Sequence, residues 1–262
     1  MVSSGFMPSH RLTILGSGTS VPSPRRGASG CLLALGEDLL VFDTGPGTLD
    51  RLVRAGVSPH AVTHIFYTHN HLDHTGDLAA WLFASRLPFE GRRRPLTIAG
   101  SAGFHEMLTG LESVYGHWVE PATYRLDRVA LDAAARTAFT ADGWSAQAFP
   151  VDHIPSSIGY RLTLESGRTF VHTGDTGPFD SLHEDCRDAD LLLIEASMPD
   201  GAGIAGHLTP STAGQVAARA GARRVVLTHF YPPCDRVDML EQLRKTYDGE
   251  ATLAEDGMSF DL

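Results

Sequence analysis

Short apolar segments recur along the chain, and most of them end in glycine, histidine, aspartate or threonine. Each has four to six β-favouring residues followed by a polar cluster, a pattern that predicts buried strands ending at loops. The segments with this form are residues 11–18, 39–45, 64–71, 96–101, 169–175, 190–197 and 224–230. Because reactive side chains stand where these strands stop, we expect a rigid sheet to position functional loops.

Helices are predicted between these strands. Segment 76–87 has apolar side chains at helical spacing, namely Leu78, Trp81, Leu82 and Phe83. Near the C-terminus, Thr209 can cap a helix that starts at Pro210 and stops at Gly221. The apolar face of that helix consists of Ala213, Val216, Ala217 and Ala220. The alternation predicts an α/β or α+β class, and because no linker or repeat divides the chain, we expect a single domain over residues 1–262.

The amino-acid composition limits the expected cellular compartment and the expected binding partners. The 262 residues suffice for a sizeable core, and the formal net charge of −10 disfavours nucleic acid as a general partner without excluding it. The three cysteines, Cys31, Cys186 and Cys234, are scattered and form no CxxC pair. With no signal peptide and no membrane span in the sequence, these features predict a cytoplasmic protein without a membrane partner. The sequence leaves the oligomeric state open, with a homodimer as one option.

The strongest chemical signal is segment 68–74, in which four candidate metal ligands fall within six residues after an apolar run. In an extended stretch, residues i and i+2 point to the same side, so His69 and His71 can hold one ion together. As the chain turns into the next helix, Asp73 and His74 can reach a second ion. Imidazole and carboxylate ligands suit zinc, with manganese or iron as alternatives.

Three further candidate ligands follow apolar runs elsewhere in the chain: His153, Asp175 and His229. Each is expected at a strand end on the same rim as the first four. The seven residues supply enough ligands for two ions and a bridging water, and Asp175 is the natural bridging carboxylate.

The order of these motifs resembles the metallo-β-lactamase superfamily over nearly the whole chain. More narrowly, LGSGTSVPSPRRGASG, FDTGPGT, HTGDT, LLIEAS, GHLTPSTA and residues 152–161 resemble the branch that contains the tRNA 3′-processing endonuclease RNase Z and smaller phosphodiesterases. The resemblance implies an αβ/βα four-layer sandwich with the metal site at one edge of the two sheets.

The resemblance also implies roles for individual residues. It assigns three ligands to the first metal, His69, His71 and His153. It assigns three ligands to the second metal, Asp73, His74 and His229, and it places Asp175 between the two ions. Asp43 resembles a buried acid that orients a ligand.

In the same way, the resemblance implies hydrolysis by a water that two close metals activate. His207, in GHLTP, matches a histidine that protonates the leaving oxygen, and Glu195, in IEAS, matches a glutamate that holds this histidine. Asp73, His207 and Glu195 are therefore expected to take part in catalysis. Structural or surface positions are expected for His64, His105, His117, His172 and His183.

The chain departs from RNase Z between His153 and Asp175, which only 21 residues separate. Bacterial RNase Z usually carries a long Gly/Pro-rich arm there, which holds the tRNA. The basic run 92–94 is short and is expected in a solvated loop. These features favour a small phosphate ester as the partner and predict that precursor tRNA is a poor substrate.

The leading hypothesis is therefore a di-zinc phosphodiesterase that acts on a small or cyclic phosphate ester. The alternatives are an RNase Z-type endonuclease with a reduced arm, or a hydrolase of lactones, β-lactams, thioesters or sulfate esters, because this fold hosts many chemistries. A non-catalytic metal-stabilised binding protein is a further alternative, which the seven candidate ligands disfavour. His207 with Glu195 favours phosphoryl chemistry over lactone and amide chemistry.

Overall fold

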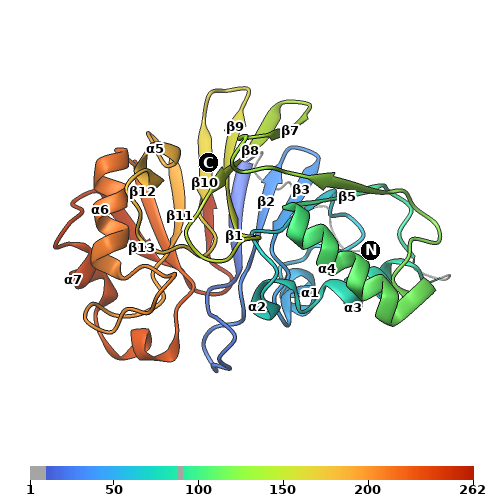
Figure 1. Ribbon diagram of the computed structural model, residues 1–262, viewed down its shortest axis with the longest axis horizontal. Helices are drawn as coiled ribbons and strands as arrows, with labels where there is room; N and C mark the ends of the chain where they lie inside the picture. Colours follow the sequence, from blue (N-terminus) through green and yellow to red (C-terminus); the bar gives the residue numbers. More distant parts are fainter. Residues whose placement is uncertain (1–9, 88–90) are drawn as a thin grey trace.

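Two seven-stranded sheets form the centre of the computed structural model, which describes residues 10–87 and 91–262 (Figure 1). The first sheet has the order β14 (Ser259–Asp261), β1 (His10–Gly16), β2 (Gly30–Leu35), β3 (Asp38–Phe42), β4 (His64–Phe66), β5 (Leu96–Gly100) and β6 (Leu126–Ala130). The second has the order β13 (Glu250–Leu253), β12 (Arg224–Thr228), β11 (Leu191–Glu195), β10 (Thr169–His172), β9 (Ile158–Leu164), β8 (Trp144–Pro150) and β7 (Ala138–Ala141).

Strand direction decides which loops meet. Strands β3 to β6 are parallel to one another, and so are β10 to β13. Strand β8 runs in the same direction as β10, because both pair antiparallel with β9. The carboxyl ends of β8, β10, β11 and β12 therefore lie at one edge of the second sheet, where open sheets of this kind bind ligands.

Helices cover the outer faces of both sheets. Those packed beside the first sheet are α1 (Thr48–Arg54), α3 (Leu78–Ser85) and α4 (Ala102–Tyr115), and α2 (Leu72–Thr75) follows β4. Those beside the second sheet are α5 (Leu182–Asp185), α6 (Pro210–Ala220) and α7 (Met239–Leu243). Two 3₁₀ turns, Gly116–Trp118 and Pro232–Arg236, complete the elements. Figure 1 shows α4 and α6 on opposite sides of the paired sheets, so the expected αβ/βα sandwich is confirmed.

Alternation along the strands builds two apolar layers. In β4, Phe66 faces the core between the sheets, whereas Ile65 faces the layer under the helices. Between the sheets, the ring of Phe66 stacks on Phe42 at 5.2 Å and meets the edge of Tyr160 at 5.3 Å. The hydroxyl of Tyr160 donates to the carbonyl of Tyr67 at 2.6 Å, so this core joins the second sheet to the strand that leads into the 68–74 motif.

The local predictions agree with these elements. A strand overlaps each of the seven predicted apolar segments, with β1 and β3 starting one residue earlier than predicted. Helix α3 lies within segment 76–87, and α6 begins at Pro210 and is followed by Gly221 in a left-handed conformation. Among the described residues, no helix is long and apolar enough to cross a membrane.

The basic run 92–94 differs from its prediction in one residue. Arg93 and Arg94 are exposed, but Arg92 is completely buried. Its guanidinium donates to backbone carbonyls of Pro59, His60, Val62, Arg94 and Pro95. The expectation of a solvated loop was therefore wrong for Arg92, because five carbonyls of the surrounding loops converge on this one side chain.

The buried position of Arg92 predicts a large effect on stability. Arg92→Ala removes five hydrogen bonds made by a completely buried side chain, and we expect it to lower the free energy of unfolding by about 3–5 kcal/mol. The matched control is Arg93→Ala, an exposed position where the change should stay within about 0.5 kcal/mol. Urea unfolding followed by circular dichroism measures both, and equal stabilities of the two variants would contradict the assignment.

Candidate metal centre

The seven predicted ligands stand on strand ends of both sheets. They follow β4 (His69, His71), lie in α2 (Asp73, His74), or follow β8 (His153), β10 (Asp175) and β12 (His229). The structure brings all seven together in two groups, His69, His71, His153 and Asp175, and Asp73, His74 and His229. Within each group the ligand atoms lie within 4.8 Å of one another.

In the first group, imidazole nitrogens converge from two sheets. His153 Nε2 lies 3.1 Å from His71 Nδ1. The carboxylate oxygen Asp175 Oδ2 lies 3.7 Å from His69 Nε2 and 3.8 Å from His153 Nε2. These separations leave space for one ion among the four side chains.

The second group shares the same carboxylate. His74 Nε2 and His229 Nε2 are 3.3 Å apart, and His229 Nε2 lies 3.5 Å from Asp73 Oδ2. Asp175 Oδ2 lies 3.4 Å from His74 Nε2 and 3.3 Å from His229 Nε2. Because one oxygen of Asp175 faces members of both groups, its position is that of a bridging ligand.

The polar atoms of the cluster are suited to bind metal ions. His69 Nε2 is buried and has no hydrogen-bond partner in the described part of the chain. Buried nitrogen and oxygen atoms without a partner are rare in proteins, and a cation would satisfy this one together with the facing nitrogens around it. The groups are typical of a two-metal site, and imidazole with carboxylate suits zinc. The ligand role of each residue stays a prediction.

Hydrogen bonds behind the cluster fix the orientation of its rings. Asp43 Oδ2 lies 2.7 Å from His74 Nδ1, as expected of a buried acid that orients a ligand. Thr68, which the sequence analysis did not single out, donates from its backbone N–H and its hydroxyl to the Asp43 carboxylate, both at 2.8 Å. Its signal in the sequence is its place directly before the first histidine of the motif.

The loop before His207 supports His153. His153 Nδ1 lies 2.9 Å from the carbonyl oxygen of Gly206, which leaves Nε2 for an ion. Gly206 has φ +76°, and a Cβ there would lie 2.9 Å from His153 Nδ1. The sequence analysis also missed this glycine, whose need for left-handed backbone and close approach depends on the tertiary contact.

Two residues of this centre have a strained backbone. Asp43 has φ +58° and His229 has φ +63°, a conformation that is unfavourable for residues with a Cβ. Such strain costs about 1–3 kcal/mol for each residue and persists where surrounding contacts hold it, commonly at functional sites.

Charge within the cluster keeps its carboxylates ionised. Burial alone would raise the pKa of Asp73, but the hydrogen bond to His229 and the charge of His74 lower it to about 2. Burial likewise opposes ionisation of Asp175, yet the neighbouring imidazoles His229 and His74 hold its pKa well below the usual value. For His69, burial is the largest cause and the pKa is lowered, which favours the neutral imidazole. For His74, burial alone would lower the pKa, but the charges of Asp175 and Asp43 raise it, so a bound cation would have to replace its proton. Ionised carboxylates and neutral imidazoles are the forms that bind metals.

The predicted acid pair lies beside the ligands. His207 Nδ1 is 2.9 Å from Glu195 Oε1, and Glu195 itself is buried. Burial alone would lower the pKa of His207, but the hydrogen bond and the charge of Glu195 raise it above the usual value. A nitrogen of His207 also lies within 4.8 Å of ligand atoms of Asp175 and His229, so the pair shares the space of the metal cluster.

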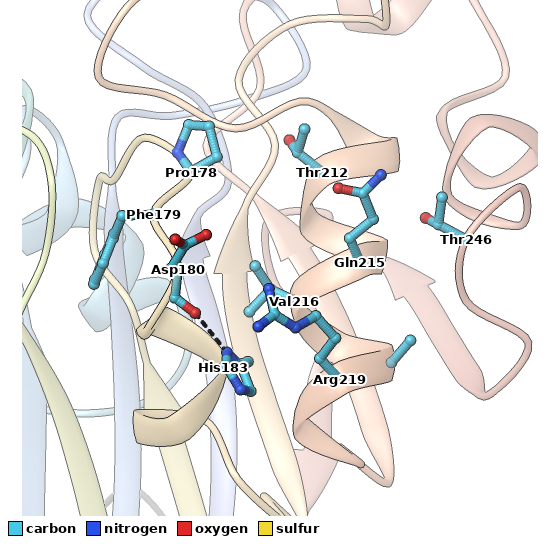
Figure 2. Close-up of a pocket in the computed structure, with 10 residues that line it drawn as sticks. Pro178, Phe179, Asp180, His183, Thr212, Gln215, Val216, Arg219 and Thr246 are labelled. Carbon is cyan, nitrogen blue, oxygen red and sulfur yellow. Dashed lines mark hydrogen bonds between the residues drawn. The ribbon is translucent and has the colours of Figure 1, made fainter.

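Other sites lie apart from this centre. The surface cavity of about 450 Å³ in Figure 2 lies between α5 and α6, with Asp180 and His183 on one side and Gln215 and Arg219 on the other. None of the seven predicted ligands lines it. Two of the remaining histidines have structural contacts, as expected: His64 packs against Trp144, and His172 is buried beside Phe42.

Comparisons with known proteins find similarity over nearly the whole chain. A model of the beta-lactamase superfamily domain matches residues 39–230. Ribonuclease Z of Haloferax volcanii is 30% identical over 97% of this chain and 95% of its own length. That alignment spans 309 positions against 262 residues here, so at least 47 positions are occupied by the relative alone.

Solved structures share the architecture. Human tRNase Z, short form, superposes with a TM-score of 0.77 at 28% identity, covering 96% of this chain and 98% of that one. The metallo-β-lactamase fold protein YhfI of Bacillus subtilis gives a TM-score of 0.82 at 23% identity, with the same coverage. A zinc-bound PqqB from Methylobacterium extorquens has the same fold, with a TM-score of 0.75, 16% identity, and coverage of 96% of this chain and all of that one.

The geometry predicts a metal stoichiometry. After reconstitution with zinc, the protein should hold about two ions per chain by elemental analysis. Asp175→Ala removes the oxygen that both groups share, so we expect loss of at least one ion and of hydrolytic activity. Asp180→Ala, an exposed aspartate five residues further on, is the matched control and should keep both ions. Retention of two ions by Asp175→Ala would show that Asp175 is not a bridging ligand.

Proposed function

The chain belongs to the metallo-β-lactamase superfamily and is a metal-dependent hydrolase, and we propose that the bond it hydrolyses is a phosphodiester. The observation that carries this proposal is His207, held 2.9 Å from Glu195 Oε1 beside the ligand cluster. Cleavage of a phosphodiester releases an oxygen that needs a proton or charge neutralisation. A histidine oriented by a carboxylate is suited to supply that proton.

The parts of the site have separate tasks in this mechanism. Two bound metal ions would activate water at neutral pH and stabilise the charge of an in-line displacement. Asp175 and the imidazoles around it would hold the ions, and Asp73 would complete the second group. Glu195 engages Nδ1 of His207, which leaves Nε2 to deliver a proton to the leaving oxygen.

Among possible phosphodiester substrates, similarity to the named relatives favours the 3′ end of an RNA. Similarity to ribonuclease Z of H. volcanii and to human tRNase Z extends over nearly the whole chain. This supports RNase Z-type cleavage more directly than the small phosphate ester that the sequence analysis placed first. RNase Z-type endonuclease activity is therefore the leading candidate.

A small or cyclic phosphate ester is the second candidate, and one structural observation favours it. Strand β9 begins at Ile158, shortly after His153, and residues 165–168 connect β9 directly to β10. No arm that could hold a tRNA extends from this part of the chain. The net charge of −10 also provides little general attraction for a polyanion.

The proposal predicts an order among substrates. With zinc bound, the protein should hydrolyse bis-p-nitrophenyl phosphate faster than p-nitrophenyl phosphate, a β-lactam or a lactone. Lactone turnover without phosphodiester turnover would refute the proposal. Cleavage assays with a 3′-extended precursor tRNA and with a cyclic nucleotide, at physiological salt, distinguish the two candidate functions. Specific cutting after the discriminator base supports the RNase Z candidate, whereas hydrolysis of the cyclic nucleotide with intact tRNA supports the second.

His207 has a separate prediction. His207→Ala should keep both metals yet lower kcat by about 10²–10⁴ on a diester with a poor leaving group. The loss should shrink with a good leaving group, which departs without a proton. Because the acid must be protonated, wild-type kcat should fall as pH rises through the pKa that His207 has in the metal-bound protein, and the variant should lose this decline. Loss of metal in His207→Ala would instead make it a ligand. His183→Ala, an outlying histidine, is the control.

A further inference from the structure

The hydroxyl of Ser197 joins the metal cluster to the acid pair. Ser197 follows β11 by two residues and is completely buried. Its Oγ lies 3.0 Å from Nδ1 of the predicted ligand His229 and 3.0 Å from Nδ1 of His207. The hydroxyl donates to Oε2 of Glu195, the oxygen that His207 does not use.

The direction of each hydrogen bond follows from the proposed roles of His229 as a metal ligand and His207 as an acid. For His229 to bind an ion through Nε2, its proton must be on Nδ1, and Ser197 Oγ accepts that proton's hydrogen bond. The hydroxyl has a single proton, which it donates to Glu195 Oε2. Since His207 donates from Nδ1 to Oε1, one buried carboxylate supports both a ligand and the acid.

The backbone of Ser197 holds three loops in place. Its N–H donates to the carbonyl of Leu208, next to His207, at 3.1 Å. Its carbonyl accepts from the N–H of Tyr231, two residues after His229, also at 3.1 Å. The side chain of Ser197 therefore sits where the ends of β11 and β12 and the loop of the acid meet.

We propose that Ser197 is a positioning residue that couples the ligand His229 to the acid pair His207–Glu195. Its hydroxyl keeps the proton of His229 on Nδ1. Because the hydroxyl is polarised by its hydrogen bond to the Glu195 carboxylate, its oxygen accepts more strongly from that N–H, which strengthens metal binding by the ring. The same hydroxyl fixes the Glu195 carboxylate, so that Oε1 stays aimed at His207. The second effect rests on the proposed function, whereas the first concerns metal binding alone.

The first test measures metal affinity and needs no substrate. Ser197→Ala leaves the buried Nδ1–H of His229 without an acceptor, and we expect affinity for the more weakly held zinc to fall about 10–100-fold in competition with a chelator. Ser197→Thr keeps the hydroxyl and should restore affinity toward wild type. Ser85→Ala, which removes a fully buried hydroxyl from α3, is the matched control and should bind zinc as wild type does. Wild-type affinity in Ser197→Ala, or an equal loss in Ser85→Ala, would overturn the proposal.

The second test measures the coupling to the acid at saturating zinc. On a diester with a poor leaving group, Ser197→Ala should lower kcat, and the loss should shrink with a good leaving group. In the Ser197→Ala/His207→Ala double variant, the two losses should be less than additive, because both remove the same proton delivery. Fully additive losses would refute this coupling. If the wild type cleaves no phosphodiester, the proposed function fails, and the zinc affinities still decide the role of Ser197 toward His229.

Discussion

The carboxylate of Asp175 faces four imidazoles at 3.3 to 3.8 Å, and this convergence constrains the rest of the molecule. Buried polar atoms so close together are stable only when their charges and lone pairs are satisfied, and metal ions do this for imidazole and carboxylate. The second sheet brings His153, Asp175 and His229 to one edge because β8, β10 and β12 share a direction. The strained backbone of Asp43 and His229 is held at the same place.

Contacts behind the cluster orient three of its imidazole rings. His74 contacts Asp43, His153 contacts the carbonyl of Gly206, and His229 contacts Ser197, in each case through Nδ1. The Nε2 atoms are thereby left for ions. The candidate metal site thus depends on contacts in the interior of the fold, whereas we propose that the choice of substrate depends on segments outside the cluster, such as the short connection between β9 and β10.

Much of the fold and of the candidate site could be predicted from the sequence, because the signals are local. The motif of segment 68–74 occupies a single loop, and the cap, apolar face and stop of α6 lie within a dozen residues of one another. Edge strands such as β6 and β7 were not predicted, since they alternate half-buried and exposed residues and lack a continuous apolar run. The ligand and catalytic roles, and the single domain, stay predictions.

By itself, the sequence determined seven of the strands, helices α3 and α6, the superfamily resemblance and the candidate residues for binding metal. Only the tertiary structure decided that Arg92 is buried, that Gly206 and Thr68 orient the cluster, and that Ser197 links His229 to Glu195. The physical reason is distance along the chain. Arg92 meets carbonyls some 30 residues away, and Ser197 meets His229 across 32 residues, so no local pattern records these contacts. They exist only once the sheets have packed and the strand ends have met.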